Sequence, residues 1–120
     1  MTFRETLQCI VENVEGGIGA VIMGYDGIPI DEYIRGDAPY DMQLLAVEYA
    51  TVLKEVKRTI DILKTGEMEE MSITTERTRI LVRAVTEDFF IFLALDRQGN
   101  YGKGRYLLKR DVPKMQESLR

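Results

Sequence analysis

The stretch that decides the fold is DMQLLAVEYATVLKEVKRTIDILK, residues 41–64. It contains neither glycine nor proline, and its apolar side chains recur at steps of three and four residues, the spacing of one face of an α-helix. At about 1.5 Å per residue this helix is roughly 36 Å long, enough to cross a small sheet. Asp41 is expected to cap it. The predicted core-facing stripe consists of Leu45, Tyr49, Val52, Leu53, Val56, Ile60 and Leu63.

The two halves of this helix differ on the sides away from the stripe. In the second half these sides are polar, with Lys54, Glu55, Lys57, Arg58, Asp61 and Lys64. In the first half they carry the apolar residues Leu44, Ala46, Val47 and Ala50. A helix that is apolar on all sides is buried on all sides. We therefore expect a second layer over the first half, which we take to be another copy of the same helix.

Shorter elements flank the long helix. Residues 2–14 predict a helix that opens with a Thr2/Glu5 capping box, and residues 18–25 and 28–34 predict a hairpin that turns at Asp26-Gly27. Pro29 places the second of these strands at a sheet edge. After the long helix, three strands are expected at residues 67–75, 78–86 and 89–95. A last helix is expected over residues 103–119, with Pro113 kinking or splitting it.

This order of elements predicts an α+β fold. The links between the last three strands are short, so neighbouring strands are expected to be antiparallel. A five-stranded antiparallel sheet has two faces to bury, and the helices divide between them. We predict a profilin-like three-layer sandwich, with the long helix on one face and the two terminal helices on the other. At 120 residues, the chain is expected to form one domain, 1–120.

Composition excludes several classes of function. The net charge is −4 and the basic residues are interspersed with acidic ones, so no nucleic-acid partner is expected. No apolar run approaches the length of a membrane span and no leader is visible, so we expect a cytoplasmic protein without a membrane partner. The chain has no histidine and only Cys9 as a thiol, so neither a metal site nor a cofactor is expected.

Two stretches resemble the Roadblock/LC7 domain family. GGIGAVIMGYDGIPID, residues 16–31, is similar to the first hairpin of that family, and LALDRQGNYGKGRYLLKR, residues 93–110, is similar to its closing strand, turn and helix. The resemblance extends to the order and length of nearly all elements. The bacterial members linked to gliding motility and cell polarity are the most similar, because of the Asn100-Tyr101-Gly102 and Arg105-Tyr106-Leu107-Leu108 segments.

The resemblance implies a homodimer and a partner. Such domains pair the third strand and the long helix with their copies, so the interface here would combine the four apolar helix residues with the strand residues Glu69, Met71 and Ile73. The carboxylates of Glu69 and Glu70 would then need solvent or a basic neighbour such as Arg77 or Arg79. Gliding-type members bind a small Ras-like GTPase and stimulate its GTP hydrolysis by repositioning the GTPase's own catalytic residues.

The function expected from the resemblance is regulation of a small Ras-like GTPase by a homodimer that is not itself an enzyme. A scaffold or light-chain subunit without effect on GTP turnover is the alternative, and a small-ligand sensor is a third interpretation. The predicted partner-binding residues are Lys54, Glu55, Lys57, Arg58 and Asp61. The same charges are also typical of an ordinary solvated face, with an attractive Lys57–Asp61 pair, and the sequence leaves both interpretations open.

Overall fold

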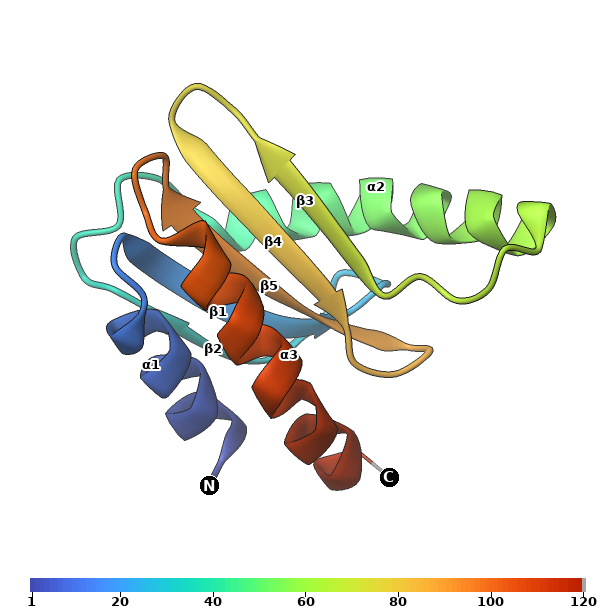
Figure 1. Ribbon diagram of the computed structural model, residues 1–120, viewed down its shortest axis with the longest axis horizontal. Coiled ribbons are helices and arrows are strands. Elements are labelled where there is room, and N and C mark those ends of the chain that lie inside the picture. The colour runs from blue at the N-terminus through green and yellow to red at the C-terminus, as the bar shows by residue number, and fades with distance from the viewer. Residues whose placement is uncertain (120) are drawn as a thin grey trace.

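The computed structural model describes residues 1–119, which form three helices and a five-stranded sheet (Figure 1). The first half of the chain contains α1 (Phe3–Asn13), β1 (Gly17–Gly24), β2 (Pro29–Ile34) and α2 (Met42–Leu63). The second half contains β3 (Glu70–Thr74), β4 (Thr78–Ala84), β5 (Phe89–Asp96) and α3 (Tyr101–Ser118). The predicted element order is therefore confirmed.

The sheet has the strand order β2-β1-β5-β4-β3, and every neighbouring pair is antiparallel. β5 lies in the middle and is apolar on both faces, with Phe90 and Phe92 pointing to one side and Ile91 and Leu93 to the other. β2 and β3 are the two edge strands. Pro29 lies in β2, at an edge, as a residue without a backbone N–H requires.

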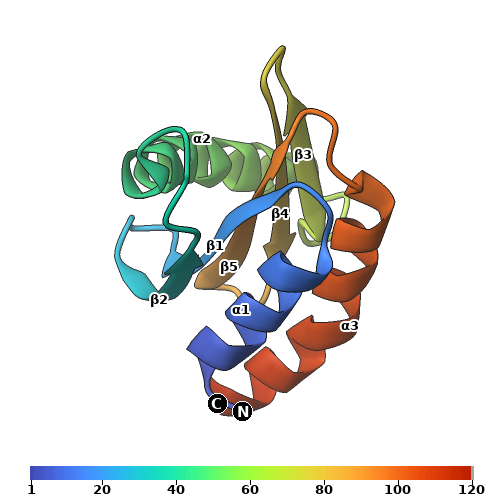
Figure 2. The same ribbon diagram turned by 90° about the vertical axis from the view of Figure 1, so that its left-hand side faces the viewer.

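Two separate cores lie on the two faces of the sheet. α1 and α3 cover one face, and α2 lies across the other (Figure 2). This arrangement confirms the predicted three-layer sandwich. It makes α2 the only helix of residues 1–119 on its face of the sheet.

Local signals in the sequence account for most helix ends. The Thr2 hydroxyl accepts from the Glu5 N–H while the Glu5 carboxylate accepts from the Thr2 N–H, which is the predicted capping box. The Asp41 carboxylate accepts from the N–H groups of Gln43 and Leu44. α3 begins after Asn100 and continues past Pro113 as one helix, so the predicted split does not occur. Pro113 lies on the exposed side of α3.

The core-facing side of α2 differs from the predicted stripe. Leu53 is fully buried, but Val52 and Leu63 keep 47% and 64% of their surface exposed. Ala46 and Ala50, predicted to face a partner, are each only 1% exposed and belong to the core between α2 and the sheet. The buried side of α2 is therefore centred on Leu53 and these two alanines.

Candidate partner-binding surfaces

Apolar side chains lie along the side of α2 that points away from the sheet. Leu44 and Val47 in the first half are 58% and 43% exposed, and Ile62 near the end is 62% exposed. Leu44 and Ile62 are about five helical turns apart, so they project from the same side. Val52 and Leu63 are exposed as well, so aliphatic groups occur along the length of the helix with polar residues between them. Such a surface on a small protein is typical of an interaction site.

Of the four helix residues predicted at the dimer interface, only two lie on this outer side. Leu44 and Val47 are exposed there, whereas Ala46 and Ala50 are excluded because they contact the sheet of their own chain. The sequence pattern missed Ile62, Val52 and Leu63 as outer residues. A helical wheel centred on Leu53 and the two alanines would have found them.

The charged residues predicted to bind a partner are also on α2, and four of the five are exposed: Lys54, Glu55, Arg58 and Asp61. Arg58 donates two hydrogen bonds to a Glu55 carboxylate oxygen, at 3.1 and 3.2 Å. Both side chains are more than 60% exposed, and such a pair contributes little to stability. These four residues are accessible to a partner.

Lys57 has a different role from the one predicted. It is half-buried, its Nζ lies 4.6 Å from the centroid of the Tyr25 ring, and it donates to the backbone carbonyl of Glu87. The expected Lys57–Asp61 ion pair does not form. Lys57 therefore fastens α2 to two loops of its own chain.

β3 provides the second surface, because its outer edge has no neighbouring strand in the described chain. Met71 and Ile73 are half-buried and pack against the core beneath α2, while Glu69 is exposed. The hydrogen bonds between β3 and β4 show which backbone groups of β3 point to its open edge. Thr75 donates to the Thr78 carbonyl and Ala84 donates to the Glu69 carbonyl.

Residues of an antiparallel strand alternate between bonding the neighbour and pointing away from it. Because residues 69 and 75 bond β4, residues 71 and 73 also do so, and the N–H groups of Glu70, Ser72 and Thr74 point to the open edge. A further strand could pair here without disturbing β4. The edge is thus available for the strand pairing that the sequence led us to expect.

Glu69 is exposed to solvent, and Glu70 has basic neighbours other than the predicted Arg77 or Arg79. Arg105 of α3 donates to the Glu70 carboxylate at 2.7 Å, and the Arg83 guanidinium lies 3.8 Å from the same oxygen. The sequence could not indicate the contact with Arg105, because it depends on α3 lying beside β4 and β3. This arrangement neutralises Glu70 without a partner chain.

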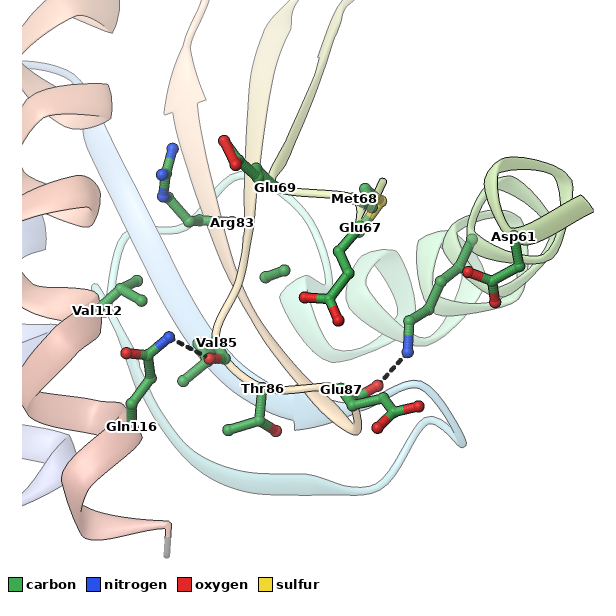
Figure 3. Close-up of a pocket in the computed structure, with 12 residues that line it drawn as sticks. Asp61, Glu67, Met68, Glu69, Arg83, Val85, Thr86, Glu87, Val112 and Gln116 are labelled. Carbon is green, nitrogen blue, oxygen red and sulfur yellow. Dashed lines mark hydrogen bonds between the residues drawn. The ribbon is translucent and has the colours of Figure 1, made fainter. Parts of the chain in front are cut away.

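A pocket of about 600 Å³ opens between the C-terminal half of α2, the segment before β3, and α3 (Figure 3). Asp61 and Glu67 lie on one side of it, and Val112 and Gln116 of α3 on the other. The Gln116 amide donates to the Val85 carbonyl at 2.8 Å, and both residues line the pocket. Within residues 1–119 no group of three or more potential ligand residues is placed to hold a metal ion.

Two half-buried tyrosines have a raised pKa. Burial raises the pKa of Tyr25 to about 12. Burial, with a smaller contribution from the charge of Asp96, raises the pKa of Tyr40 to about 12. Both hydroxyls are buried without a hydrogen-bond partner in the described chain. These shifts come from packing and keep the phenols neutral, so they indicate structural side chains.

The helices of residues 1–119 include none that is both long and apolar enough to span a membrane. The described residues present an exposed side of α2, an open strand edge and several pockets. They suit contacts with another protein surface.

Comparisons with known proteins bear on the whole chain. The Roadblock/LC7 domain model matches residues 4–95. MglC from Myxococcus xanthus, a crystal structure, is 38% identical over 98% of this chain and 99% of that chain, with a TM-score of 0.72. A Roadblock/LC7 domain from Streptomyces avermitilis has a TM-score of 0.85 at 12% identity, covering 99% of this chain and 98% of that one.

The gliding protein MglB from Thermus thermophilus has a TM-score of 0.81 at 19% identity, covering 94% of this chain and 84% of that one. The last two likenesses concern the fold alone. No curated protein sequence matches this chain. The family model spans the elements from α1 to β5, and the MglC match extends through α3. This chain belongs to the Roadblock/LC7 domain family.

Proposed function

We propose that this chain is a homodimeric regulator of a small Ras-like GTPase and performs no chemistry of its own. The observation that carries the proposal is the exposed outer side of α2, where aliphatic residues alternate with Lys54, Glu55, Arg58 and Asp61. Membership of the Roadblock/LC7 family supports it. The similarity to MglC and to gliding-protein MglB structures supports a role in bacterial gliding motility or cell polarity, in the cytoplasm.

The dimer proposed here combines the two open surfaces. Ser72 and its neighbours in β3 would pair with the same strand of a second copy, and the apolar residues Leu44 and Val47 would approach their counterparts. An isologous contact of this kind is closed by a two-fold axis and does not propagate. It would join two sheets into one and place two α2 helices side by side.

Regulation without chemistry requires a rigid surface that fits one conformation of the partner better than another. A regulator that binds the GTP-bound switch loops more tightly shifts the GTPase toward that conformation by the difference in affinity. The sheet beneath α2 supplies the rigidity, and Lys57 ties the helix to the Tyr25 and Glu87 loops. In this proposal the residues that stimulate hydrolysis belong to the GTPase.

A scaffold subunit without effect on GTP turnover is the second candidate. The observation that favours it is the engagement of Lys57 and Arg58 by their own chain, since both cations already have partners. Fewer charged side chains are then free to act on a switch loop.

Light scattering separates the two candidates. The chain is measured alone and with a Ras-like GTPase of the same genome, loaded with GDP or with a non-hydrolysable GTP analogue. A regulator is expected to give twice the 13.8 kDa of one chain, and to bind only the GTP-analogue form. A dimer that binds both forms equally would favour the scaffold, and a monomer at all concentrations would contradict both.

A further inference from the structure

A third surface, besides the outer side of α2 and the open edge of β3, lies on the face of the molecule opposite α2. α3 crosses β4 and β5 and leaves β3 uncovered on that face (Figures 1 and 2). Gly104 allows this close crossing, because a Cβ there would lie 3.2 Å from side-chain carbons of Leu81 and Leu93. Between the uncovered strand and α3 runs a groove of about 420 Å³.

Arginine, lysine and tyrosine dominate the lining of this groove. α3 contributes Tyr101, Arg105, Tyr106 and Lys109, and β4 contributes Arg83. Arg79 borders it, with its guanidinium carbon 5.0 Å from the centre of the Tyr101 ring. Only Glu69 and Glu70 bring negative charge. The groove is therefore cationic, although the whole chain has a net charge of −4.

Several donors of the groove are unused. Lys109 makes no hydrogen bond or ion pair with any residue of the described chain, and Tyr106 is 63% exposed. Lys109 and Tyr106 thus have donors that a partner could reach and that the described chain does not use.

Glu70 shows how the groove holds a carboxylate. Its Oε1 accepts from the Arg105 Nε at 2.7 Å and lies 3.8 Å from the Arg83 guanidinium. An arginine has five N–H donors, so Arg105 keeps further donors after this bond. A second carboxylate could bind the remaining donors of Arg105 together with the free ammonium of Lys109.

We propose that the groove between α3 and β3 binds an acidic segment of a partner protein, which pairs its carboxylates with Arg105 and Lys109 and packs an apolar side chain on Tyr106. Tyrosine and arginine are the residue types that interfaces and their energetic centres favour. The basic side chains of the groove outnumber its carboxylates, which favours an acidic occupant over a second copy of the same groove. The proposal does not depend on GTPase binding, which we assign to α2.

Fluorescence anisotropy tests the proposal with a fluorescein-labelled, glutamate-rich peptide that contains a phenylalanine. Its control is the same peptide with every glutamate replaced by glutamine. The glutamate peptide is expected to bind, more weakly as salt is raised, and the glutamine peptide to bind at least about tenfold more weakly, a difference of about 1.4 kcal/mol. Equal affinity for the two peptides would overturn the proposal.

Two matched double variants locate the site. Arg105→Gln/Lys109→Gln removes two positive charges from the groove, and Lys54→Gln/Arg58→Gln removes two from α2 on the opposite face. The groove variant is expected to weaken peptide binding about tenfold and the α2 variant to change it less than about twofold. Equal losses would show that only net charge matters, and would overturn the proposal.

Two further measurements locate the binding site without any substitution and test other classes of partner. Backbone amide shifts of the wild-type chain, recorded with the peptide, are expected to move in residues 101–109 and in β3 and β4. Shifts confined to other segments would overturn the proposal. So would binding to anionic lipid vesicles or RNA that depends on Arg105 and Lys109 when the peptide does not bind. GTPase binding by the groove variant is measured in a separate experiment. The proposal for the groove and the proposal for GTPase regulation can then fail independently of each other.

Discussion

The ammonium group of Lys57 lies 4.6 Å from the centroid of the Tyr25 ring, and so connects the middle of α2 to the loop after β1. The same lysine donates to the Glu87 carbonyl. The Tyr25 ring in turn contacts Phe90 of β5, with ring centroids 5.0 Å apart. This contact joins the outer helix to the centre of the sheet through one half-buried cation.

The two partners of this contact are expected to respond oppositely to substitution. Lys57→Met keeps the aliphatic packing and removes the charge, and we expect it to lower the free energy of unfolding by about 1 kcal/mol. Tyr25→Phe keeps the ring and removes a buried hydroxyl that has no partner in the described chain, so stability should stay unchanged or rise by up to about 1 kcal/mol. Urea unfolding measures both. A larger loss for Tyr25→Phe than for Lys57→Met would contradict this assignment.

Alkaline pH should destabilise the protein through its two buried phenols. The pKa values of Tyr25 and Tyr40 are raised to about 12 in the folded chain, from 10.0. Between these values the unfolded chain has lost protons that the folded chain retains, so the free energy of unfolding falls as pH rises above 10. Below pH 10 these groups have no effect on the pH dependence.

The matched variant for this prediction is Tyr25→Phe/Tyr40→Phe. It is expected to flatten the dependence of the urea midpoint on pH between 10 and 12, relative to the wild type. Lysine deprotonation remains in both proteins and cancels in the comparison. Parallel curves for the two proteins would show that the phenols do not control alkaline unfolding.

The sequence allowed most of the fold to be predicted, because periodicity and caps are local. The apolar run of β5 and the capping residues Thr2 and Asp41 each indicated one structure without reference to distant residues. Of the two outcomes predicted at Pro113, a kink or a split, the split does not occur, because α3 continues through Pro113 to Ser118.

The candidate site was less predictable, because it depends on distances between elements. Which side of α2 is buried follows from how closely Ala46 and Ala50 approach the sheet, and a pattern of apolar residues does not contain that distance. The pair between Arg105 and Glu70 requires a strand order that periodicity does not reveal. All four residues are apolar, and only their exposure in the structure distinguishes Leu44 and Val47 from Ala46 and Ala50.

A larger side chain at position 46 tests whether Ala46 packs against the sheet of its own chain and not against a second copy. Ala46→Leu inserts carbon atoms between α2 and the sheet, and we expect a loss of about 1–3 kcal/mol in the free energy of unfolding. Because the strain lies within one chain, the loss should be the same at low and high protein concentration. Leu44→Glu, on the outer side, should change only the concentration dependence. The reverse pattern in urea unfolding would return Ala46 to the dimer interface.

Arg58 is expected to be dispensable for any stimulation of GTP hydrolysis. In the proposed function the residues that stimulate hydrolysis belong to the GTPase, and Arg58 pairs on the surface with Glu55 of its own chain. Arg58→Ala should therefore leave the maximal rate of GTP hydrolysis unchanged, whereas loss of a true arginine finger costs about 10³–10⁵-fold. Single-turnover hydrolysis at saturating regulator measures the rate. A loss of that size would assign Arg58 a direct role in hydrolysis.

Ser72→Pro tests the strand half of the proposed dimer. The Ser72 N–H points to the open edge of β3, so proline there removes one donor of the outer edge and leaves the bonds to β4 intact. We expect the variant to fold with near wild-type circular dichroism and to scatter light as a monomer at concentrations where the wild type is a dimer. Ser72→Ala keeps the N–H and should remain a dimer. If Ser72→Pro dimerises as strongly as Ser72→Ala, the copies do not pair through β3, and the contact must rest on Leu44, Val47 and the other outer residues of α2.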